Sequence, residues 1–350
     1  MLPSTRALHS SFQPHSRHSR PTPVIPAALP SFSPHSRHSS SSPVIPAKAG
    51  IHHPHLPTIS VPSTPTNFLA LPPEQAALDS AAAVLIPVPI DSTTSFRSGA
   101  RYGPAAIIAA SAALEDYDLE LGIDVAELGI HTTPPLEPHV GDPQAMARRV
   151  QAAVSHYAAM DKLTGVIGGD HSAAIGSALA WHERHPDLSI LYIDAHADLR
   201  DEYQGTAWGH GSAARRIADH CPVTLVGVRT LAIEERDYIQ AAGIPTCYWP
   251  STDSDYVHNI IATLTPQVYV SVDLDALDPS EMAAVGTPEP GGMRWPDLTA
   301  LLRRVAEQRQ IVGFDVCELA PNEGPPANAY TAAKLVQKLI AYSCHLAPAQ

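Results

Sequence analysis

The chain has 350 residues, of which 44% are hydrophobic and 16% are charged, and its formal net charge at pH 7 is −13. This composition is typical of a globular protein, and no apolar run reaches the roughly 20 residues that a membrane-spanning helix needs. The acidic balance argues against nucleic acid and anionic membranes as partners and favours cations. Four scattered cysteines exclude a disulfide framework and a CxxC zinc site, which favours a reducing cytoplasm.

Residues 1–73 have a composition of their own. They hold 15 of the 35 prolines and eight of the 19 histidines, with five basic residues and no acidic one. Residues 11–30 and residues 31–50 agree at 13 of 20 aligned positions. Two such units, rich in proline and serine, bury too little apolar surface to offset the entropy of ordering, so we expect residues 1–73 to be disordered.

Three interpretations of this extension are open. A translated repetitive DNA element upstream of the true start is favoured, because the VIP runs do not make an amphipathic helix. The Ser- and Arg-rich composition without acidic residues is also typical of a transit peptide. A His-rich tract, finally, can hold metal ions.

From about residue 80 the chain alternates short apolar strands with helices. The helix signals include Asp142 followed by Pro143, a good N-cap and a favoured first-turn proline. A second helix starts at Pro296, and a last one spans residues 330–346. Near-continuous apolar strands separated by helices predict a three-layer α/β/α domain over residues 74–350, with a mostly parallel central sheet. The predicted strands lie at 84–90, 164–168, 189–194, 223–228, 268–275 and 311–319.

Three of these strands end in acidic residues and histidines. The strand at 164–168 is followed by GDH at 169–171, the next strand ends in DAHAD at 194–198, and a later one ends in DLDALDP at 273–279. The carboxyl ends of parallel strands meet at one edge of a sheet, and alternate side chains of a strand share a face. We therefore expect six side chains to converge there: His171, Asp194, His196, Asp198, Asp273 and Asp275.

This pattern predicts a centre for two metal ions. Four carboxylates cannot be buried together without cations to offset their repulsion and desolvation, and two divalent ions would balance them. Carboxylate and imidazole ligands without thiolate favour Mn²⁺ over a structural Zn²⁺. Two ions about 3.5–4 Å apart can share a water, lower its pKa and direct it at an electrophilic carbon or phosphorus. Taken singly, each acidic strand end could instead cap a helix or line a turn.

Three sequence motifs carry a resemblance to a known family. GGDHS, DAHAD and SVDLDALDP, in this order, resemble the signature motifs of the ureohydrolases, the arginase and agmatinase family. The resemblance covers about residues 84–345 and implies an arginase-like fold, two Mn²⁺ ions per chain and a homo-oligomer, either a trimer or a hexamer. It also implies the ligands: His171 and Asp198 for one ion, His196 and Asp275 for the other, and Asp194 and Asp273 bridging both.

Two further residues are candidates for the chemistry of the substrate. His210, twelve residues after Asp198, lies in a loop that could fold back over the metal ions, and histidine suits proton transfer near neutral pH. An ordinary loop histidine is the alternative. Glu318 ends the strand at 311–319, where its carboxylate could pair bidentately with a guanidinium. The resemblance implies the same two roles, and Asp315 could support the metal ligands from within the strand.

The loop at 199–209 bears on the substrate. It reads LRDEYQGTAWG, and its Asp201 and Glu202 predict an acidic rim, suited to a substrate whose far end is cationic or uncharged. This loop and VGTPEPGGM at 285–293 most resemble agmatinases, which implies hydrolysis of agmatine to urea and putrescine in polyamine biosynthesis. Guanidinobutyrate, whose carboxylate Arg200 could hold, and arginine are alternative substrates. A non-catalytic metal-binding protein is the alternative function.

Overall fold

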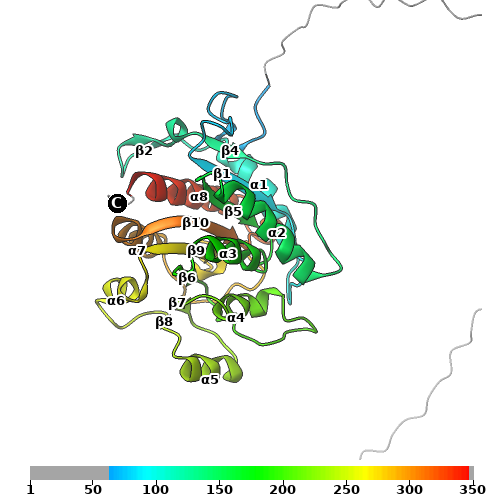
Figure 1. Cartoon of the computed structure of the whole chain (residues 1–350), viewed down its shortest axis with the longest axis vertical. Coiled ribbons are helices and arrows are strands. Elements are labelled where there is room, and N and C mark those ends of the chain that lie inside the picture. Colours follow the sequence, from blue (N-terminus) through cyan, green and yellow to red (C-terminus); the bar gives the residue numbers. More distant parts are fainter. Residues whose placement is uncertain (1–62, 347–350) are drawn as a thin grey trace, which may run out of the picture. The chain divides into compact units, whose positions relative to one another are not determined.

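The computed structural model describes residues 63–346, in which eight strands form one parallel sheet (Figure 1). The strands are β1 Ala83–Val88, β4 Ile130–Thr132, β5 Leu163–Gly168, β6 Ser189–Ile193, β7 Val223–Val228, β8 Thr246–Tyr248, β9 Gln267–Asp273 and β10 Gln310–Cys317. Their order is β4-β1-β5-β10-β9-β6-β7-β8, and every neighbouring pair is parallel. The prediction of a mostly parallel central sheet is confirmed, and all six predicted strands are present.

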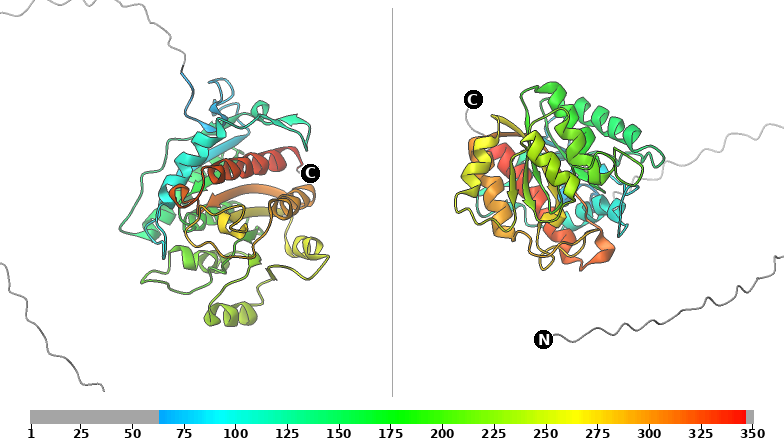
Figure 2. Two further views of the ribbon diagram at one scale, coloured as in Figure 1. Left: turned by 180° about the vertical axis from the view of Figure 1, so that it is seen from behind. Right: turned by 90° about the horizontal axis from the view of Figure 1, so that it is seen from below.

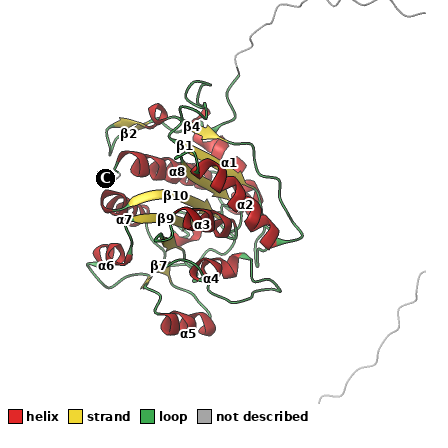
Figure 3. Ribbon diagram, in the orientation of Figure 1, coloured by secondary structure: helices red, strands yellow, loops and turns green. Residues whose placement is uncertain are grey.

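Helices cover both faces of this sheet (Figure 2 and Figure 3). They are α1 Gly103–Ser111, α2 Pro143–Ala158, α3 Ala173–Arg184, α4 Ala213–Ala218, α5 Ile233–Ala242, α6 Tyr256–Thr263, α7 Trp295–Gln308 and α8 Ala327–His345. One face packs against α1, α6, α7 and α8, and the other against α2, α3, α4 and α5, which confirms the three-layer arrangement. Asp142 caps α2 as predicted, because its carboxylate accepts a hydrogen bond from the Ala145 N–H at 3.0 Å.

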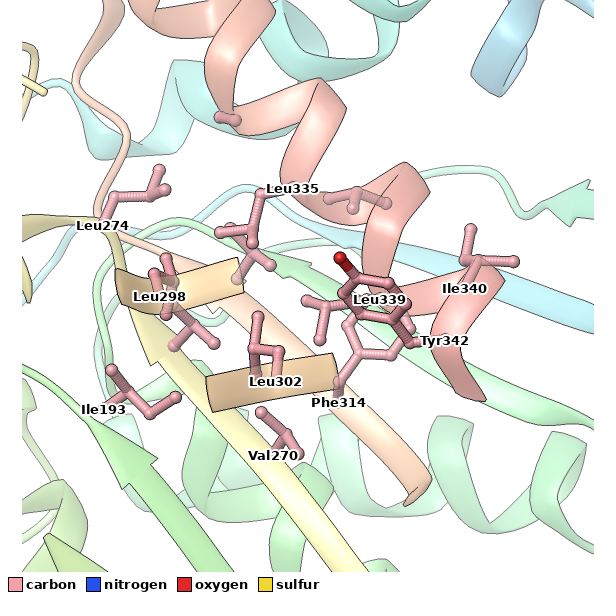
Figure 4. Close-up of a cluster of buried hydrophobic side chains, with 14 of the residues drawn as sticks. Ile193, Val270, Leu274, Leu298, Leu302, Phe314, Leu335, Leu339, Ile340 and Tyr342 are labelled. Atoms are coloured by element: carbon pink, nitrogen blue, oxygen red, sulfur yellow. The ribbon is translucent and has the colours of Figure 1, made fainter. Parts of the chain in front are cut away.

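The layer between the sheet and helices α7 and α8 fixes β9 and β10, two neighbouring central strands. Leu298 and Leu302 of α7 and Leu339 of α8 share a buried cluster with Val270 of β9 and Phe314 of β10 (Figure 4). Burying each of these side chains stabilises the fold by about 1.5–3 kcal/mol. Because both strands are held by this packing, the positions of their carboxyl ends are set as well.

The two edge strands of the sheet have no counterpart among the predicted strands. β4 and β8 span three residues each, which is too short for an apolar pattern to stand out. A separate hairpin of β2 Tyr117–Asp118 and β3 Ile123–Asp124 also lacks an apolar run. None of the six predicted metal ligands lies on these elements.

The packed body begins ahead of residue 74, which is the predicted boundary. Phe68 is fully buried, and its backbone N–H donates to Thr132 Oγ1 at 3.0 Å. Residues 63–73 therefore belong with the body. The two repeat units at 11–50 lie outside the described residues.

Helix α8 has 19 residues and carries Lys334 and Lys338. Within residues 63–346, no helix combines the length and the apolar character that crossing a bilayer requires. The four cysteines of the chain are free thiols, and two of them, Cys221 and Cys317, are buried.

Candidate active site

The predicted metal ligands gather at the carboxyl edge of the sheet, beyond four neighbouring strands. β5, β10, β9 and β6 are the central strands, and a cavity of about 270 Å³ lies at their carboxyl ends. Asp194 is only 1% exposed and contacts two histidines of the cavity lining. The other seven predicted site residues line the cavity: His171, His196, Asp198, His210, Asp273, Asp275 and Glu318.

Three carboxylates surround one ring nitrogen of His171. Its Nδ1 lies 2.9 Å from Asp194 Oδ2 and 3.3 Å from Asp273 Oδ2. Asp198 Oδ2 is 3.5 Å from the same nitrogen and accepts a hydrogen bond from the Tyr192 hydroxyl at 2.7 Å. All of these side chains are buried. One imidazole nitrogen and three carboxylates at this spacing could hold a divalent cation.

Asp194 also faces a second histidine. His196 Nδ1 lies 3.4 Å from Asp194 Oδ1 and 3.0 Å from Asp275 Oδ2. Asp194 therefore belongs to two groups of three possible ligands. Within each group, the ligand atoms lie within 4.8 Å of one another. The geometry fits two cations joined by a carboxylate that reaches both.

Turns after the strands, rather than continued extended backbone, bring these side chains together. β6 ends at Ile193, and Asp198 has a left-handed backbone with a φ of 51°. Asp275 lies in a 3₁₀ turn, where its N–H donates to Asp273 Oδ1 at 2.7 Å. The expectation that alternation along extended strands aligns the ligands is therefore wrong, although the same residues converge. Because the chain leaves the sheet here, backbone N–H groups freed from strand pairing bind the carboxylates instead.

Asp194, Asp198, Asp273 and Asp275 form an acidic cluster with more negative charge than its histidines can neutralise. Burial, followed by the charges of Asp198 and Asp275, raises the pKa of Asp194 to about 6. Burial also raises the pKa of Asp273 well above its ordinary value, and Asp275 and Asp194 add to the shift. Burial alone would lower the pKa of His196, but Asp275 and Asp194 outweigh it and raise the pKa. The cluster therefore binds protons unless cations offset its charge, and two divalent ions would balance the four aspartates.

Two residues outside the metal motifs orient His171. Its Nε2 lies 2.9 Å from Ser271 Oγ, which donates to Asp315 Oδ1 at 3.1 Å. Because the Ser271 proton goes to Asp315, the serine oxygen accepts from Nε2–H, and Nδ1 keeps its lone pair for a metal ion. The orientation of His171 therefore fits metal binding through Nδ1. Asp315 supports this ligand from within the strand, as the sequence predicts. Ser271 was missed, although its position two residues before Asp273 in β9 places both on one face.

Glu318 and His210 complete the cavity lining. Glu318 follows β10 with a φ of 71°, and its Oε1 accepts a hydrogen bond from the His171 N–H at 2.8 Å. Burial, followed by the charge of Asp170, raises the pKa of Glu318 well above its usual range. His210 begins a 3₁₀ turn, and its Nδ1 lies 3.3 Å from Thr93 Oγ1. The structure brings both residues to one cavity, where the first could bind a cation and the second could transfer a proton.

The outer part of the cavity is not the acidic rim that the sequence predicts. Asp201 and Glu202 are exposed and lie outside the lining, and Asp201 pairs with Arg216 at 2.7 Å. Arg200 does line the cavity, and its guanidinium pairs with Glu234 at 2.7 Å. The prediction is wrong because the loop turns its two carboxylates toward solvent.

From the sequence we predict no site residue in the segment that follows β1, although residues 87–107 carry part of the family resemblance. Residues 94–97 contribute to the cavity lining, with Phe96 71% exposed and Arg97 paired to Glu323 at 3.6 Å. The sequence could have predicted that this segment lies at the site. The loop after each parallel strand of this sheet leaves at the same edge as the acidic strand ends.

Comparison with known proteins matches the chain to one family. The model of the Arginase family matches residues 81–341. The N(1)-aminopropylagmatine ureohydrolase of Synechocystis sp. is 35% identical, over 80% of this chain and 94% of its own length, and that of Thermus thermophilus is 36% identical, over 75% and 90%. The crystal structure of the agmatine ureohydrolase of Thermoplasma volcanium matches with a TM-score of 0.71 at 30% identity, over 77% of this chain and 92% of that one. The chain therefore belongs to the arginase family.

Proposed function

We propose that the chain is a manganese-dependent hydrolase that cleaves the guanidinium group of agmatine to give urea and putrescine. One observation carries this proposal: Asp194 reaches both groups of ligand atoms, and Glu318 and His210 line the cavity beside them. The solved relative that is named an agmatine ureohydrolase supports the reaction and the substrate. Hydrolysis of a guanidinium needs an activated water, an anion that binds the planar cation and a proton donor for the leaving amine.

The proposed metal ligands form two sets that share the Asp194 carboxylate. Two divalent ions held there would supply an acidified water for attack on the guanidinium carbon. Carboxylate and imidazole ligands without a thiolate suit Mn²⁺. We assign His171 and Asp198 to one ion, His196 and Asp275 to the other, and Asp194 to both. We also assign Asp273 to both ions, on the family resemblance.

Glu318 is the proposed anchor of the guanidinium group. Its Oε1 accepts a hydrogen bond from the His171 N–H, which holds the carboxylate in one orientation at the cavity. A carboxylate pairs with a planar guanidinium through two parallel N–H···O hydrogen bonds. Because burial raises the pKa of Glu318, a cationic substrate is the partner that stabilises its ionised form.

His210 is the proposed proton donor to the leaving amine. It lines the cavity, and the ring of Tyr203 packs edge-on against it with a centroid separation of 5.7 Å. The imidazole can take a proton from the attacking water and pass it to the amine nitrogen, so one group serves both transfers. A positioned acid–base residue of this kind contributes about 10²–10⁴-fold in rate.

N(1)-aminopropylagmatine is a second candidate substrate, favoured by the relatives at 35% and 36% identity that are named for it. Its aminopropyl extension would reach the outer cavity beside Arg200 and Tyr203. The guanidino acids, 4-guanidinobutyrate and arginine, fit less well. Both arginines of the cavity lining pair with carboxylates, Arg97 with Glu323 and Arg200 with Glu234, so a substrate carboxylate would have to compete for them.

Urea release by the Mn²⁺-loaded protein tests these assignments. The substrates are agmatine, N(1)-aminopropylagmatine, 4-guanidinobutyrate and arginine, and Asp194→Asn serves as the inactive control. We expect the highest kcat/KM with agmatine. A higher value with N(1)-aminopropylagmatine would move the assignment to the second candidate. Arginine as the best substrate, or no urea from any of the four, would contradict the proposal.

We further propose that the protein acts in the cytoplasm, in polyamine biosynthesis, as a homo-oligomer of three or six copies. The free thiols of its four cysteines suit a reducing compartment. The acidic cluster at the cavity suits a small cationic guanidino partner. Size-exclusion chromatography with light scattering tests the assembly, and a monomer at micromolar concentration would contradict it.

A further inference from the structure

Thr93 joins two residues that lie far apart in the sequence. Its Oγ1 lies 3.0 Å from Asp170 Oδ2 and 3.3 Å from His210 Nδ1. The backbone N–H of His210 donates to the same oxygen at 3.0 Å. The N–H of Thr93 donates in turn to Asp170 Oδ2 at 3.1 Å. Asp170, Thr93 and His210 therefore form one hydrogen-bonded unit, which we call the Thr93 bridge.

A glycine lies where the two loops approach each other closely. A Cβ added to Gly209 would lie 3.2 Å from Thr93 Cβ and 3.1 Å from Thr206 Cγ2. The φ of Gly209 is −90°, which any residue adopts, so the glycine provides space rather than an unusual backbone conformation. The missing side chain leaves room at the point where the backbone of His210 meets the Thr93 hydroxyl.

Asp170 is surrounded by hydrogen-bond donors. It is fully buried, and its Oδ2 accepts from both the N–H and the hydroxyl of Thr93. Its Oδ1 accepts from the Ser172 N–H at 3.2 Å and from the Ser172 hydroxyl. All four hydrogen bonds are donated to Asp170, so its oxygens act only as acceptors here. The hydroxyl proton of Thr93 therefore points to Asp170.

Counting protons then sets the state of the His210 ring. A threonine hydroxyl has one proton and two lone pairs. With the proton donated to Asp170, both lone pairs accept, one from the backbone N–H of His210 and one from its Nδ1–H. A neutral imidazole with its proton on Nδ1 has its free lone pair on Nε2, the ring nitrogen that does not contact Thr93.

We propose that Thr93, oriented by Asp170, is a positioning residue that holds His210 as the Nδ1–H tautomer. This inference rests on the proton-transfer role proposed for His210. In that role Nε2 accepts a proton from the attacking water and returns it to the leaving amine nitrogen, while Nδ1–H keeps its partner on Thr93 throughout. The other tautomer would present a proton to the water that it has to deprotonate.

Two variants of Thr93 separate control of the tautomer from simple packing. Thr93→Val keeps the shape of the side chain without the hydroxyl, whereas Thr93→Ser keeps the hydroxyl. We expect kcat for urea release to fall about 10- to 100-fold in Thr93→Val, with KM changed by less than about threefold and bound metal unchanged. Thr93→Ser should retain kcat within about threefold of the parent. Equal losses in both variants, or the parental kcat in Thr93→Val, would overturn the proposal.

The ring nitrogens of His210 give a readout that needs no turnover. In ¹⁵N-histidine-labelled protein loaded with diamagnetic Mg²⁺, couplings to the ring protons show which nitrogen is protonated, and a His210→Gln spectrum assigns the signals. We expect a protonated Nδ1 in the parent and in Thr93→Ser, and a mixture of tautomers in Thr93→Val. A parent with its proton on Nε2 overturns the proposal. If no guanidino compound is hydrolysed, the proposed function fails, but this spectrum still decides the tautomer.

Discussion

The Ser271 hydroxyl lies 2.9 Å from Nε2 of His171, whereas the acidic cluster faces Nδ1 of the same ring. This contact and the one from Ser271 to Asp315 fix the orientation of the imidazole. Ser271→Ala leaves Nε2–H and Asp315 without this partner, so we predict that the affinity for Mn²⁺ falls about 10- to 100-fold. Competition with a metal-chelating dye measures the affinity.

Ser189→Ala is the matched control. Ser189 is also buried in a central strand, but it begins β6 at the opposite end from the site, where its Oγ accepts from the Thr265 N–H at 3.0 Å. Both variants should lose about 1–3 kcal/mol of unfolding free energy, since each removes a side-chain hydrogen bond of a buried serine. Ser271→Ala with the Mn²⁺ affinity of the control would contradict the role given to Ser271.

His210→Ala should separate metal binding from proton transfer. The ring contacts Thr93 and Tyr203 rather than the acidic cluster, so we predict an unchanged metal content. Turnover should fall about 10²–10⁴-fold, because the acid–base group is lost. Elemental analysis and a urea-release assay measure the two quantities. His220→Ala, which removes an exposed histidine after α4, is the control and should change neither metal content nor turnover. Normal turnover in His210→Ala would contradict the proton-transfer role of His210.

Glu318→Gln should weaken substrate recognition. The amide oxygen can still accept from the His171 N–H, but the charge that pairs with the guanidinium is lost. A hydrogen bond to a charged group contributes about 1.5–3 kcal/mol, so kcat/KM for agmatine should fall about 10- to 100-fold. Glu74→Gln, at an exposed glutamate outside the cavity lining, is the control. Equal kinetics in these two variants would exclude Glu318 as the anchor.

A charged network on the β2–β3 hairpin makes stability depend on pH. Burial would raise the pKa of Glu120, but hydrogen bonds from Lys338, Arg303 and Tyr342 outweigh it and lower the pKa from 4.5 to about 2. A carboxylate with a depressed folded-state pKa stabilises the fold above its unfolded pKa, and this contribution is lost as the pH falls toward the folded value. Glu120→Gln should therefore lower the unfolding free energy by about 1 kcal/mol at neutral pH.

The difference in unfolding free energy between the parent and Glu120→Gln should shrink as the pH falls from 4.5 toward 2. Over this range Glu120 of the parent becomes protonated and loses its charge. Chemical denaturation of parent and variant across this range measures the difference. Glu74→Gln, at an exposed glutamate outside this network, is the matched control. If the loss of unfolding free energy in Glu120→Gln stays constant or grows in acid, the charged network does not stabilise the fold through ionised Glu120.

The central strands and their acidic ends could be predicted because each is a local pattern in the chain. Runs such as SILYI and VYVSV are buried on both faces of the sheet, so they are apolar without interruption. Parallel pairing then requires that Asp194 and Asp273 lie at the same edge. The helix that starts at Pro143 was predictable for the same reason, since Asp142 caps it within three residues.

The rest depends on turns and on contacts between distant segments. The left-handed backbone of Asp198 follows from how the chain leaves β6, and no local apolar pattern encodes it. Thr93 and His210 are 117 residues apart, and His171 and Ser271 are 100 apart, so their hydrogen bonds exist only once the sheet has formed. Such partners come from the fold and not from any one motif.

The metal content of the folded protein tests the two-ion centre most directly. After Mn²⁺ loading and removal of free metal, elemental analysis should find two Mn²⁺ ions per chain, one for each group of ligand atoms that shares Asp194. Dialysis against a chelator should abolish urea release from agmatine, and added Mn²⁺ should restore it. Well-folded protein that binds no transition metal, with hydrolysis that the chelator leaves unchanged, would contradict the two-ion centre.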